Sequence, residues 1–494
     1  MTVNNVIIVG GGLVGALAGC YFAKRGWDVS VYEKRADTRL EKNRLKKKSK
    51  SINLSISTRG LSAVERLDPE LLKKVASITV PAYGRMVHEI GGKTVHAIRY
   101  SENGDYTSAV NRDILNQVLL TQLETYKNVK VYFEHKLETC DLKSKTARFR
   151  DLTTGECINT RADLIIGADG AYSKVRQRLQ SSTRINLEQK YIDHAYCELL
   201  MQPKNNEFAL DPDYVHIWPR ETFLLLALPN IDKSFTCTLF MPLETFDSIQ
   251  TYDDLVHFFE KNFPDTIELF GEEALKRYFE NPKGDLFYIK TNPHHYSGNG
   301  LIVGDAAHCT VPFYAQGMNC GFEDIETLDV FLVEQAKMAS AAKVSGANQD
   351  DDDDDDDVKT NKLTPQQIEA ALIKYSACRP KDSAAMIDLA LYNYTELRSG
   401  VNNPMVTVKI FMERKLSYWF PNLFCHLYSM VSFSKLSYSE ATRRWKEQNR
   451  MINSIIMTSI GLSATVLGLG VLKISGPRLS QTTELLKLFN SKSM

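Results

Sequence analysis

A buried strand, a glycine-rich turn and a helix follow one another in the stretch NNVIIVGGGLVGALAGCYFAKRG, residues 4–26. The glycines Gly10, Gly12 and Gly15 have the spacing GxGxxG, in which the first permits a tight turn, the second lets a pyrophosphate approach the backbone and the third allows close helix–strand packing. The free N–H groups and dipole of the helix then favour a phosphate. We therefore predict an α/β dinucleotide-binding domain. A glycine-rich turn without a ligand is the alternative.

A second strand, Trp27–Tyr32, ends at the acidic residue Glu33. In dinucleotide-binding folds an acid about 20 residues beyond the glycines binds the ribose hydroxyls. An acid instead of an arginine favours an adenosine with a free 2′-hydroxyl. The cofactor expected here is therefore FAD or NAD before NADP.

Composition excludes several other classes. The 494 residues have room for two or three domains, and the net charge of zero gives no indication of a nucleic-acid surface. The nine cysteines are scattered without a CxxC pair, which is typical of reduced thiols. His294 and His295 are adjacent, but no acid or cysteine stands at metal-ligand spacing, so we expect no metal site.

The segment 451–472 is uncharged and is flanked by basic residues, among them Arg450 and Lys473. It is long enough to cross about 30 Å of hydrocarbon as a helix, which predicts a transmembrane anchor at 452–472. A buried or amphipathic helix is the alternative. Since no N-terminal signal is evident, we expect a tail-anchored protein with its catalytic body in the cytosol. The outer mitochondrial membrane is the expected location, and the endoplasmic reticulum is the alternative.

The pattern of apolar residues divides the rest of the chain. Residues 61–79, 112–127, 251–280 and 365–398 are predicted to be helical, and alternation over 191–242 predicts a meander of strands. The basic run 41–50 and the acidic run 350–357 are expected to be solvated, disordered loops. The predicted organisation is a discontinuous FAD-binding domain (1–80, 106–190 and 295–338), a substrate domain (81–105 and 191–294), an acidic insertion (339–362), a C-terminal helical region (363–450), the anchor and a tail (473–494).

Two further segments have strand-to-turn patterns that suit a flavin. ADLIIGADGAYSKVRQRL, at 162–179, is a buried strand ending in Asp169-Gly170, and the strand that begins at Gly300 ends in Gly304-Asp305. Asp305 is placed to accept a hydrogen bond from a ribitol hydroxyl. The backbone N–H groups near Gly317, Met318 and Asn319, at the start of a predicted helix, are placed to face the pyrimidine edge of a flavin.

With GxGxxG first, DG in the middle and GD before a helix, the chain resembles the single-component FAD-dependent aromatic monooxygenases, the group A flavoprotein hydroxylases. No second GxGxxG is present, which argues against the two-Rossmann disulfide reductases. The resemblance implies a Rossmann-type α/β domain that holds FAD, an inserted sheet-rich substrate domain, C-terminal helices and, here, the transmembrane helix. It also implies that NADPH binds transiently and reduces FAD. The resemblance implies further that O2 would add at flavin C4a to give a hydroperoxide that an aromatic ring would attack.

The resemblance also assigns cofactor positions. Arg112 matches an arginine near the flavin, and the backbone of Leu137 matches the adenine side. Asp169 matches a residue that serves both cofactors, with a helix cap as the alternative. The complete set of predicted cofactor residues is Gly10, Gly12, Leu13, Gly15, Glu33, Arg112, Leu137, Asp169, Gly304, Asp305, Gly317, Met318 and Asn319.

Particular phrases, such as RMVHEIGGK (85–93), VPFYAQGMNCGFED (311–324) and NYTELRS (393–399), resemble members of this family that hydroxylate a small aromatic amino acid. Arg85 and Tyr100, with Tyr106 as a fallback, match the pair that holds the substrate carboxylate. A planar guanidinium binds a carboxylate bidentately. The alternative for Arg85 is a surface arginine. Asn393, Tyr428 and Glu396 match further substrate contacts, and Phe313 with Tyr314 matches an aromatic wall. For these, helix packing and core packing are the alternatives.

Two other functions share parts of this pattern. A membrane-associated flavin epoxidase or reductase that acts on a lipid would have the FAD motifs and the anchor, but an apolar pocket in which Arg85 and Tyr100 contact no ligand. A non-catalytic carrier would have lost the nucleotide site. Intact DG and GD motifs argue against the carrier.

Overall fold

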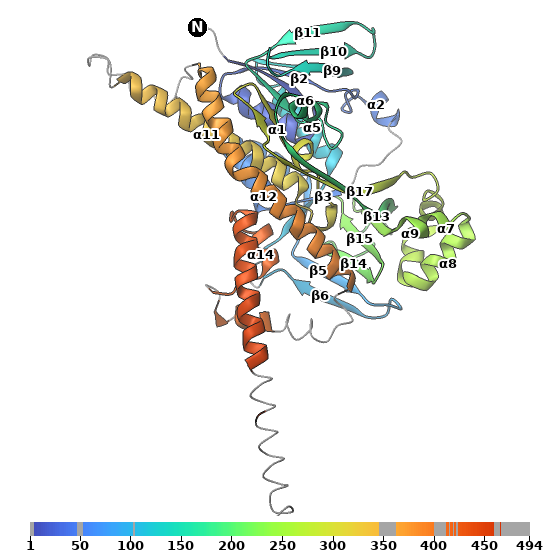
Figure 1. Ribbon diagram of the computed structural model, residues 1–494. Coiled ribbons are helices and arrows are strands. Elements are labelled where there is room, and N and C mark those ends of the chain that lie inside the picture. Colours follow the sequence, from blue (N-terminus) through green and yellow to red (C-terminus); the bar gives the residue numbers. More distant parts are fainter. Residues whose placement is uncertain are drawn as a thin grey trace, which may run out of the picture. The chain divides into compact units, whose positions relative to one another are not determined.

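The structure is a computed structural model (Figure 1) that describes residues 4–46, 53–101, 104–344, 362–399, 412–413, 415–417, 419–420, 423–458 and 465. It contains two compact units. Unit 1 comprises Met1–Asn403 and Tyr428–Ser439, and unit 2 comprises Pro404–Leu427 and Glu440–Met494. Unit 1 contains both the predicted FAD-binding region and the predicted substrate region.

A six-stranded sheet forms the centre of the nucleotide-binding part of unit 1. Its strand order is β18-β19-β12-β1-β2-β8, and β1 pairs in parallel with both β2 and β12. Alternate residues of β1 enter opposite cores, with Val6 and Ile8 on one face and Ile7 and Val9 on the other. Both faces are therefore covered, as parallel sheets require. The strands are β1 (Asn5–Val9), β2 (Asp28–Tyr32), β8 (Val129–Tyr132), β12 (Leu164–Gly167), β18 (His295–Tyr296) and β19 (Gly300–Ile302).

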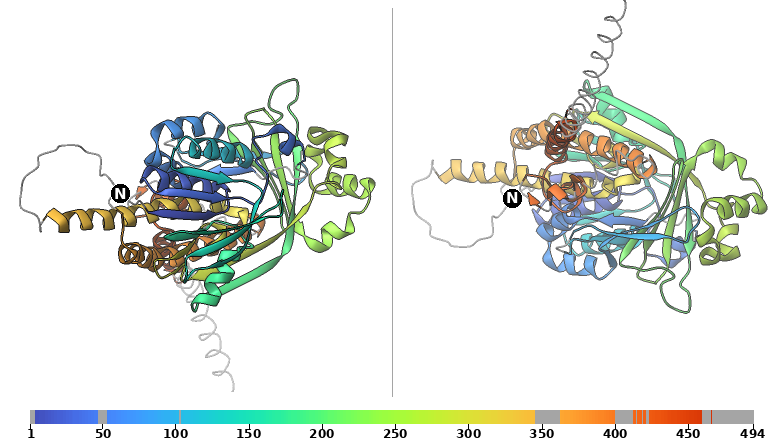
Figure 2. Two further views of the ribbon diagram at one scale, coloured as in Figure 1. Left: turned by 90° about the horizontal axis from the view of Figure 1, so that it is seen from above. Right: turned by 90° about the horizontal axis from the view of Figure 1, so that it is seen from below.

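Helices and a small sheet cover this parallel sheet (Figure 2). Helix α1 (Leu13–Lys24) packs against α5 (Arg112–Leu123) and α11 (Gly317–Val344) on one face. On the other face lie α6 (Lys174–Ser182) and a three-stranded sheet of β9 (His135–Asp141), β10 (Thr146–Asp151) and β11 (Cys157–Arg161). The fold thereby places the carboxyl ends of β1, β2 and β12 at one open edge, where ligands bind in α/β sheets.

A seven-stranded sheet with the order β17-β13-β16-β15-β14-β5-β6 makes up the second part of unit 1. Its strands alternate between two apolar faces. One face, which includes Trp218, Leu225 and Leu239, packs against α8 (Tyr252–Asn262) and α9 (Ile267–Lys276). The strands are β5 (Gly84–His88), β6 (Val95–Arg99), β13 (Asn186–Met201), β14 (Tyr214–Arg220), β15 (Phe223–Pro229), β16 (Phe235–Pro242) and β17 (Lys283–Asn292).

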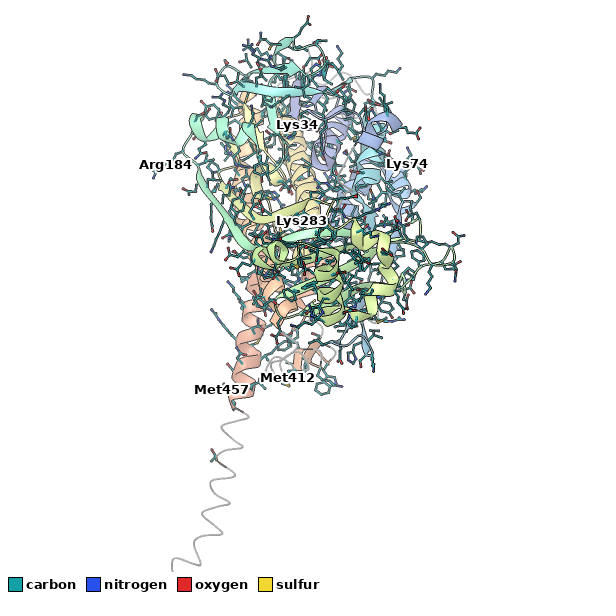
Figure 3. All side chains as sticks on the ribbon, turned by 90° about the vertical axis from the view of Figure 1, so that its right-hand side faces the viewer. Lys34, Lys74, Arg184, Lys283, Met412 and Met457 are labelled. Atoms are coloured by element: carbon teal, nitrogen blue, oxygen red, sulfur yellow. The ribbon has the colours of Figure 1, made fainter. Side chains whose placement is uncertain are left out.

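The remaining described elements are a third sheet and several further helices. The third sheet has the strand order β3-β7-β4. Figure 3 shows the side chains of the protein, among them Lys74 and Arg184, which are exposed on the surface of unit 1. The strands of this sheet are β3 (Asn53–Ile56), β4 (Thr79–Ala82) and β7 (Thr107–Asn111). The other helices are α2 (Glu41–Lys46), α3 (Thr58–Leu67), α4 (Pro69–Ala76), α7 (Leu243–Ser248), α8 (Tyr252–Asn262), η1 (Pro264–Thr266), α9 (Ile267–Lys276), α10 (Asp305–His308), η2 (Pro312–Tyr314), α12 (Pro365–Ser399), α14 (Leu427–Ser432) and a helix at 438–458.

The predicted charged insertions differ from the structure where it describes them. The basic run was expected to be a loop, but Glu41–Lys46 forms helix α2. Lysine, arginine and glutamate are good helix formers, which explains this difference. The predicted acidic insertion at 339–362 overlaps the last turns of α11, which extends to Val344. Its acidic run, 350–357, lies outside the described residues.

The predicted fold class is wrong in its transmembrane helix. Among the residues that the structure describes, no helix combines the length and the apolar character that crossing a bilayer requires. The helix at 438–458 carries ion pairs that join Arg443 and Arg444 to Glu440, and its charged residues all precede residue 451. Its described uncharged part, 451–458, is too short to cross a bilayer. Of the predicted span, 459–464 and 466–472 lie outside the described residues.

Candidate functional site

A nucleotide cavity of about 490 Å³ lies at the carboxyl ends of β1, β2 and β12. Most of the predicted cofactor residues line it. Gly10, Gly12 and Leu13 come from the first turn, Glu33 from the end of β2, Leu137 from β9 and Asp169 from the end of β12. Asp305, Gly317, Met318 and Arg112 line its other end. Gly15 and Gly304 are not among the lining residues.

The first turn is built around two close backbone approaches. Gly10 has φ +103°, and a Cβ atom there would lie 2.4 Å from the carbonyl oxygen of Ala168. A Cβ atom at Gly15 would lie 1.9 Å from the carbonyl oxygen of Gly10, so helix α1 contacts the turn directly. These contacts confirm the roles that the glycine spacing predicted for Gly10 and Gly15.

The N-terminus of α1 is open toward the cavity. Its N-cap, Gly12, supplies no side-chain cap, and the first turn contains no acid. A Cβ atom at Gly12 would meet nothing closer than 3.9 Å, so space for a ligand lies beside it. Unpaired N–H groups at a helix N-terminus bind phosphate. The turn therefore fits the pyrophosphate of a dinucleotide.

The carboxylate of Glu33 is held by neighbouring groups. One oxygen accepts a hydrogen bond from the backbone N–H of Gly11 at 2.7 Å, and the other accepts from the Nε of Arg35 at 2.8 Å. Burial opposes the charged form of Glu33, but Arg35 and the backbone donors outweigh this effect and lower its pKa. Glu33 is thus an anion at the cavity wall, and each of its two carboxylate oxygens already accepts a hydrogen bond from the protein.

Asp169 is half-buried, and one of its carboxylate oxygens is hydrogen-bonded while the other has no partner. Its Oδ2 accepts from the backbone N–H of Lys174 at 2.7 Å, at the start of α6, while Oδ1 is buried and has no hydrogen bond. Burial raises the pKa of Asp169. Since Asp169 lines the cavity, the predicted helix cap and a ligand contact are compatible. An orphaned buried acceptor fits a hydroxyl-bearing cofactor.

A substrate cavity of about 680 Å³ adjoins the nucleotide cavity. Both cavities are lined by Arg112, Ala171, Tyr172, Asp305, Gly317 and Met318. The second face of the seven-stranded sheet forms its apolar wall, through every other residue of three strands. These residues are Val215, Ile217, Leu226, Leu228, Thr238 and Phe240.

Arg85, on β5, lies in this substrate cavity among aromatic rings. Its guanidinium carbon is 4.3 Å from the ring centre of Tyr428 and 5.9 Å from that of Tyr100, and the two rings stack on each other at 4.9 Å. Burial disfavours the charge, but Tyr428, Tyr100 and Tyr314 raise the pKa of Arg85 above its ordinary value. Within the described residues Arg85 forms no ion pair, although Asp285 and Asp305 also line this cavity. The fallback Tyr106 is exposed and contacts Tyr83 instead.

Some of the other predicted substrate residues line the substrate cavity, and others hold the lining residues in place. Phe313 and Tyr314 line the cavity, and the ring of Phe313 stacks on Tyr394 at 3.8 Å. Asn393 is not in the wall. Its Nδ2 donates to the carbonyl of Phe313 at 2.7 Å, which fixes the wall from behind. Glu396 belongs to α12, and its side chain lies outside the described residues.

Asn319 is also a supporting residue. It is fully buried, its Oδ1 accepts from the backbone N–H of Ser57 at 2.9 Å, and its Nδ2 donates to the carbonyl of Ser55 at 2.9 Å. This side chain joins the start of α11 to the end of β3. It therefore positions Gly317 and Met318, which do line the cavities.

A buried ionic network lies behind the Gly304-Asp305 turn. Asp324, which is fully buried, accepts from His308 at 2.5 Å, from the backbone N–H of Gly304 at 3.0 Å and from Arg379 at 2.9 Å. His308, Cys320 and Asp324 are close enough to hold a metal ion. However, the guanidinium of Arg379 also contacts the sulfur of Cys320, at 3.1 Å, so a cation is already present. The network fixes the turn that carries Asp305.

The charge of His308 should be measurable as a pH dependence of stability. Burial opposes its charge, but Asp324 outweighs burial and raises the pKa of His308 well above 6.5. Between pH 6.5 and that raised value the native state holds a proton that the unfolded state has lost. The free energy of unfolding should therefore fall as pH rises, by about 1.4 kcal/mol per pH unit from this group. Urea unfolding of wild type and of His308→Gln between pH 7 and 9 would measure this, and equal slopes would contradict it.

Several lining residues were not predicted from the sequence. Tyr172 and Ala171 line both cavities, Tyr196 and Phe240 line the substrate cavity, and Arg35 lines the nucleotide cavity. The period-two alternation of 191–242 contained the signal for Phe240 and its neighbours. It did not indicate which face is covered by helices and which faces a cavity.

Comparison with known proteins agrees with this geometry. The model of the FAD binding domain family matches residues 4–348. The chain is 38% identical to the kynurenine 3-monooxygenase of Sus scrofa, over 94% of this chain and 92% of that protein. It is 38% identical to that of Candida albicans, over 92% and 94%.

Solved structures show the same fold at lower identity. The tetrameric form of 2-methyl-3-hydroxypyridine-5-carboxylic acid oxygenase superposes with a TM-score of 0.62 at 20% identity, covering 82% of this chain and 95% of that one. PqsL of P. aeruginosa in complex with 2-aminobenzoylacetate gives a TM-score of 0.59 at 19% identity, covering 81% of this chain and 97% of that one. The glycine turn, the cavity at the carboxyl ends of the strands and the near full-length similarity lead to one conclusion. The chain is a flavoprotein monooxygenase that belongs to the kynurenine 3-monooxygenase family.

Proposed function

We propose that this protein uses FAD to hydroxylate L-kynurenine at ring carbon 3, consuming NADPH, one proton and O2 and giving 3-hydroxykynurenine, NADP⁺ and water. One oxygen atom is inserted into the ring C–H bond, the other leaves as water, and NADPH supplies the two electrons. When bound, FAD supplies the redox chemistry that converts O2 into an oxygen donor. This reaction belongs to tryptophan catabolism and leads toward pyridine nucleotide synthesis.

One observation carries the proposal. Arg85 is a charged group without an ion pair among the described residues, and it lies in the cavity that continues into the nucleotide cavity. An unpaired charge away from bulk water is costly, so a ligand carboxylate there would be strongly favoured. An aromatic amino acid supplies both the carboxylate and a ring for the apolar wall. A lipid would leave Arg85 unsatisfied.

The chain's own groups then bind and orient the substrate. Arg85 binds the carboxylate through two parallel N–H donors, and the rings of Tyr100 and Tyr428 hold the guanidinium in place. The wall that includes Ile217 and Phe240 contacts the aromatic ring and excludes water from it. Asn393 keeps Phe313 in position from behind the wall.

The test is NADPH oxidation by the FAD-loaded protein, measured with and without L-kynurenine, together with the mass of the product. We expect kynurenine to stimulate NADPH oxidation and to yield a product heavier by one oxygen atom. A protein that retains FAD but shows neither effect would contradict the proposed substrate. The predicted location, on the cytosolic side of the outer mitochondrial membrane or of the endoplasmic reticulum, stays a prediction that cell fractionation would test.

A further inference from the structure

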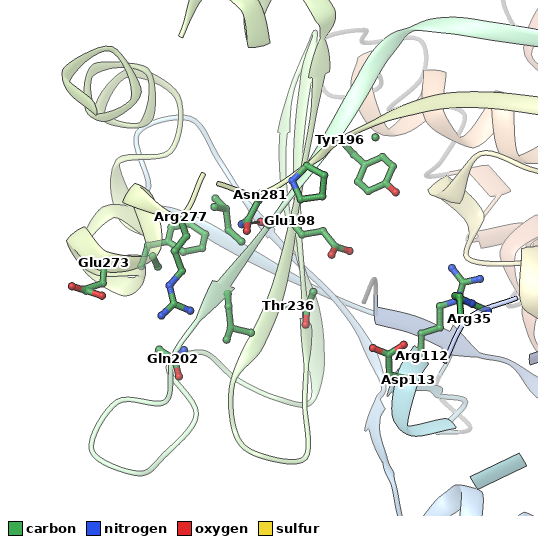
Figure 4. Close-up of a pocket in the computed structure, with 16 residues that line it drawn as sticks. Arg35, Arg112, Asp113, Tyr196, Glu198, Gln202, Thr236, Glu273, Arg277 and Asn281 are labelled. Atoms are coloured by element: carbon green, nitrogen blue, oxygen red, sulfur yellow. Dashed lines mark hydrogen bonds between the residues drawn. The ribbon is translucent and has the colours of Figure 1, made fainter. Parts of the chain in front are cut away.

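A third cavity, of about 440 Å³, lies between the two parts of unit 1. Figure 4 shows Arg35, Arg112 and Asp113 on one side of it and Glu273 and Arg277 on the other. It shares Arg35 and Arg112 with the nucleotide cavity, and Arg112, Tyr196 and Gly284 with the substrate cavity. Arg112 lines all three cavities. The third cavity therefore reaches the place where the other two meet.

The arginines Arg35, Arg112 and Arg277 and the carboxylates of Asp113, Glu198 and Glu273 line this cavity, and two of the arginines are placed to bind phosphates. Within the described residues neither Arg112 nor Arg277 forms an ion pair, whereas Arg35 is held by Glu33 at 2.8 Å. Arg277 follows the end of α9 and is exposed. Two guanidinium groups without carboxylate partners, on opposite walls of one cavity, are available for phosphate oxygens.

The remaining polar groups suit the other parts of a nucleotide. The wall also contains Glu198, Glu273, Gln202 and Asn281. Carboxylates and amides accept from ribose hydroxyls and amino groups, which a simple inorganic anion lacks. The volume is within the range of about 300–1,000 Å³ that is usual for small-molecule sites. The mixture of cations and acceptors therefore favours a nucleotide over an isolated anion.

The proposed function requires such a site. In the proposed function FAD and the aromatic substrate would fill the nucleotide and substrate cavities, and the sequence contains no second glycine motif for another dinucleotide. A nicotinamide ring must nevertheless reach the flavin. We propose that the third cavity is the docking site of NADPH, with Arg277 and Arg112 binding its phosphates from opposite walls. This inference rests on the proposed function.

Arg277 is the residue to test, because Arg112 lines all three cavities and its loss would affect every ligand. Calorimetric titration of the FAD-loaded protein with NADP⁺ measures nucleotide binding without turnover. Arg277→Ala should weaken NADP⁺ binding about 10- to 100-fold, the amount expected for lost hydrogen bonds to a charged group. The FAD content and the affinity for L-kynurenine should not change, since Arg277 lines neither of those cavities.

The matched control is Lys276→Ala. Lys276 is the neighbouring residue, has the same charge, is exposed and pairs with Glu272 at 2.5 Å, but it does not line the cavity. We expect its NADP⁺ affinity to stay within about twofold of wild type. Unchanged binding in Arg277→Ala, or an equal loss in Lys276→Ala, would overturn the assignment. Hydroxylation of kynurenine by the wild-type protein tests the proposed function separately. If the wild type hydroxylates kynurenine but the variants give either of these binding results, the NADPH site is wrong and the proposed function still holds.

Discussion

Replacement of Arg85 by alanine should raise the KM for L-kynurenine by about two to three orders of magnitude, because the substrate carboxylate loses a bidentate, charge-assisted partner in a cavity away from bulk water. The FAD content should stay at the wild-type level, because Arg85 does not line the nucleotide cavity. Steady-state kinetics and the flavin absorbance of the purified variant measure both quantities.

Two further variants make this result specific. Arg99 lies on the adjacent strand β6 and is exposed, so Arg99→Ala removes the same charge outside the cavity and should leave the KM nearly unchanged. Arg85→Lys keeps the charge but loses the two parallel donors, so its KM should lie between those of wild type and Arg85→Ala. Loss of FAD from Arg85→Ala at an unchanged KM would mean that Arg85 has a structural role.

Local geometry explains why the nucleotide cavity could be predicted from the sequence. The roles of Gly10 and Gly15 depend on backbone contacts within one strand–turn–helix unit, and only glycine has no Cβ atom to clash there. Glu33 likewise follows directly from the end of β2. Such features involve residues close in the sequence, and their spacing is fixed by the element lengths.

The substrate cavity is formed by contacts between segments that are far apart in the sequence, and the spacing of residues along the chain does not reveal such contacts. Arg85 meets Tyr428 across more than three hundred residues, and only the folded chain shows that Tyr100, not Tyr106, joins them. Asn393 and Asn319 match the family pattern but act by holding backbone in place. The sequence alone could not separate a ligand contact from this support, because both roles need a polar side chain.

The same limit applies to Glu33 and to the C-terminal segment. The partnership of Glu33 with Arg35 depends on the direction in which the chain leaves β2, which the motif does not specify. The uncharged stretch at 451–472 has the composition of a membrane span. The described helix at 438–458 includes the start of this stretch, but all of its charged residues precede residue 451, and no described helix has the required apolar length.

Gly10→Ala should abolish most FAD binding and lower the free energy of unfolding by about 3 to 5 kcal/mol. An alanine there would be strained at φ +103°, and its Cβ would lie 2.4 Å from the carbonyl oxygen of Ala168. Because both partners are backbone, the turn that faces the pyrophosphate must move.

Gly155→Ala is the matched control, since Gly155 has φ +79° in an exposed turn but no atom within 4 Å of its Cβ position. It should cost about 1 to 2 kcal/mol from backbone strain alone and retain FAD. Flavin content and urea unfolding separate the two effects, and a Gly10→Ala protein that retains its full FAD content would show that the turn tolerates the displacement.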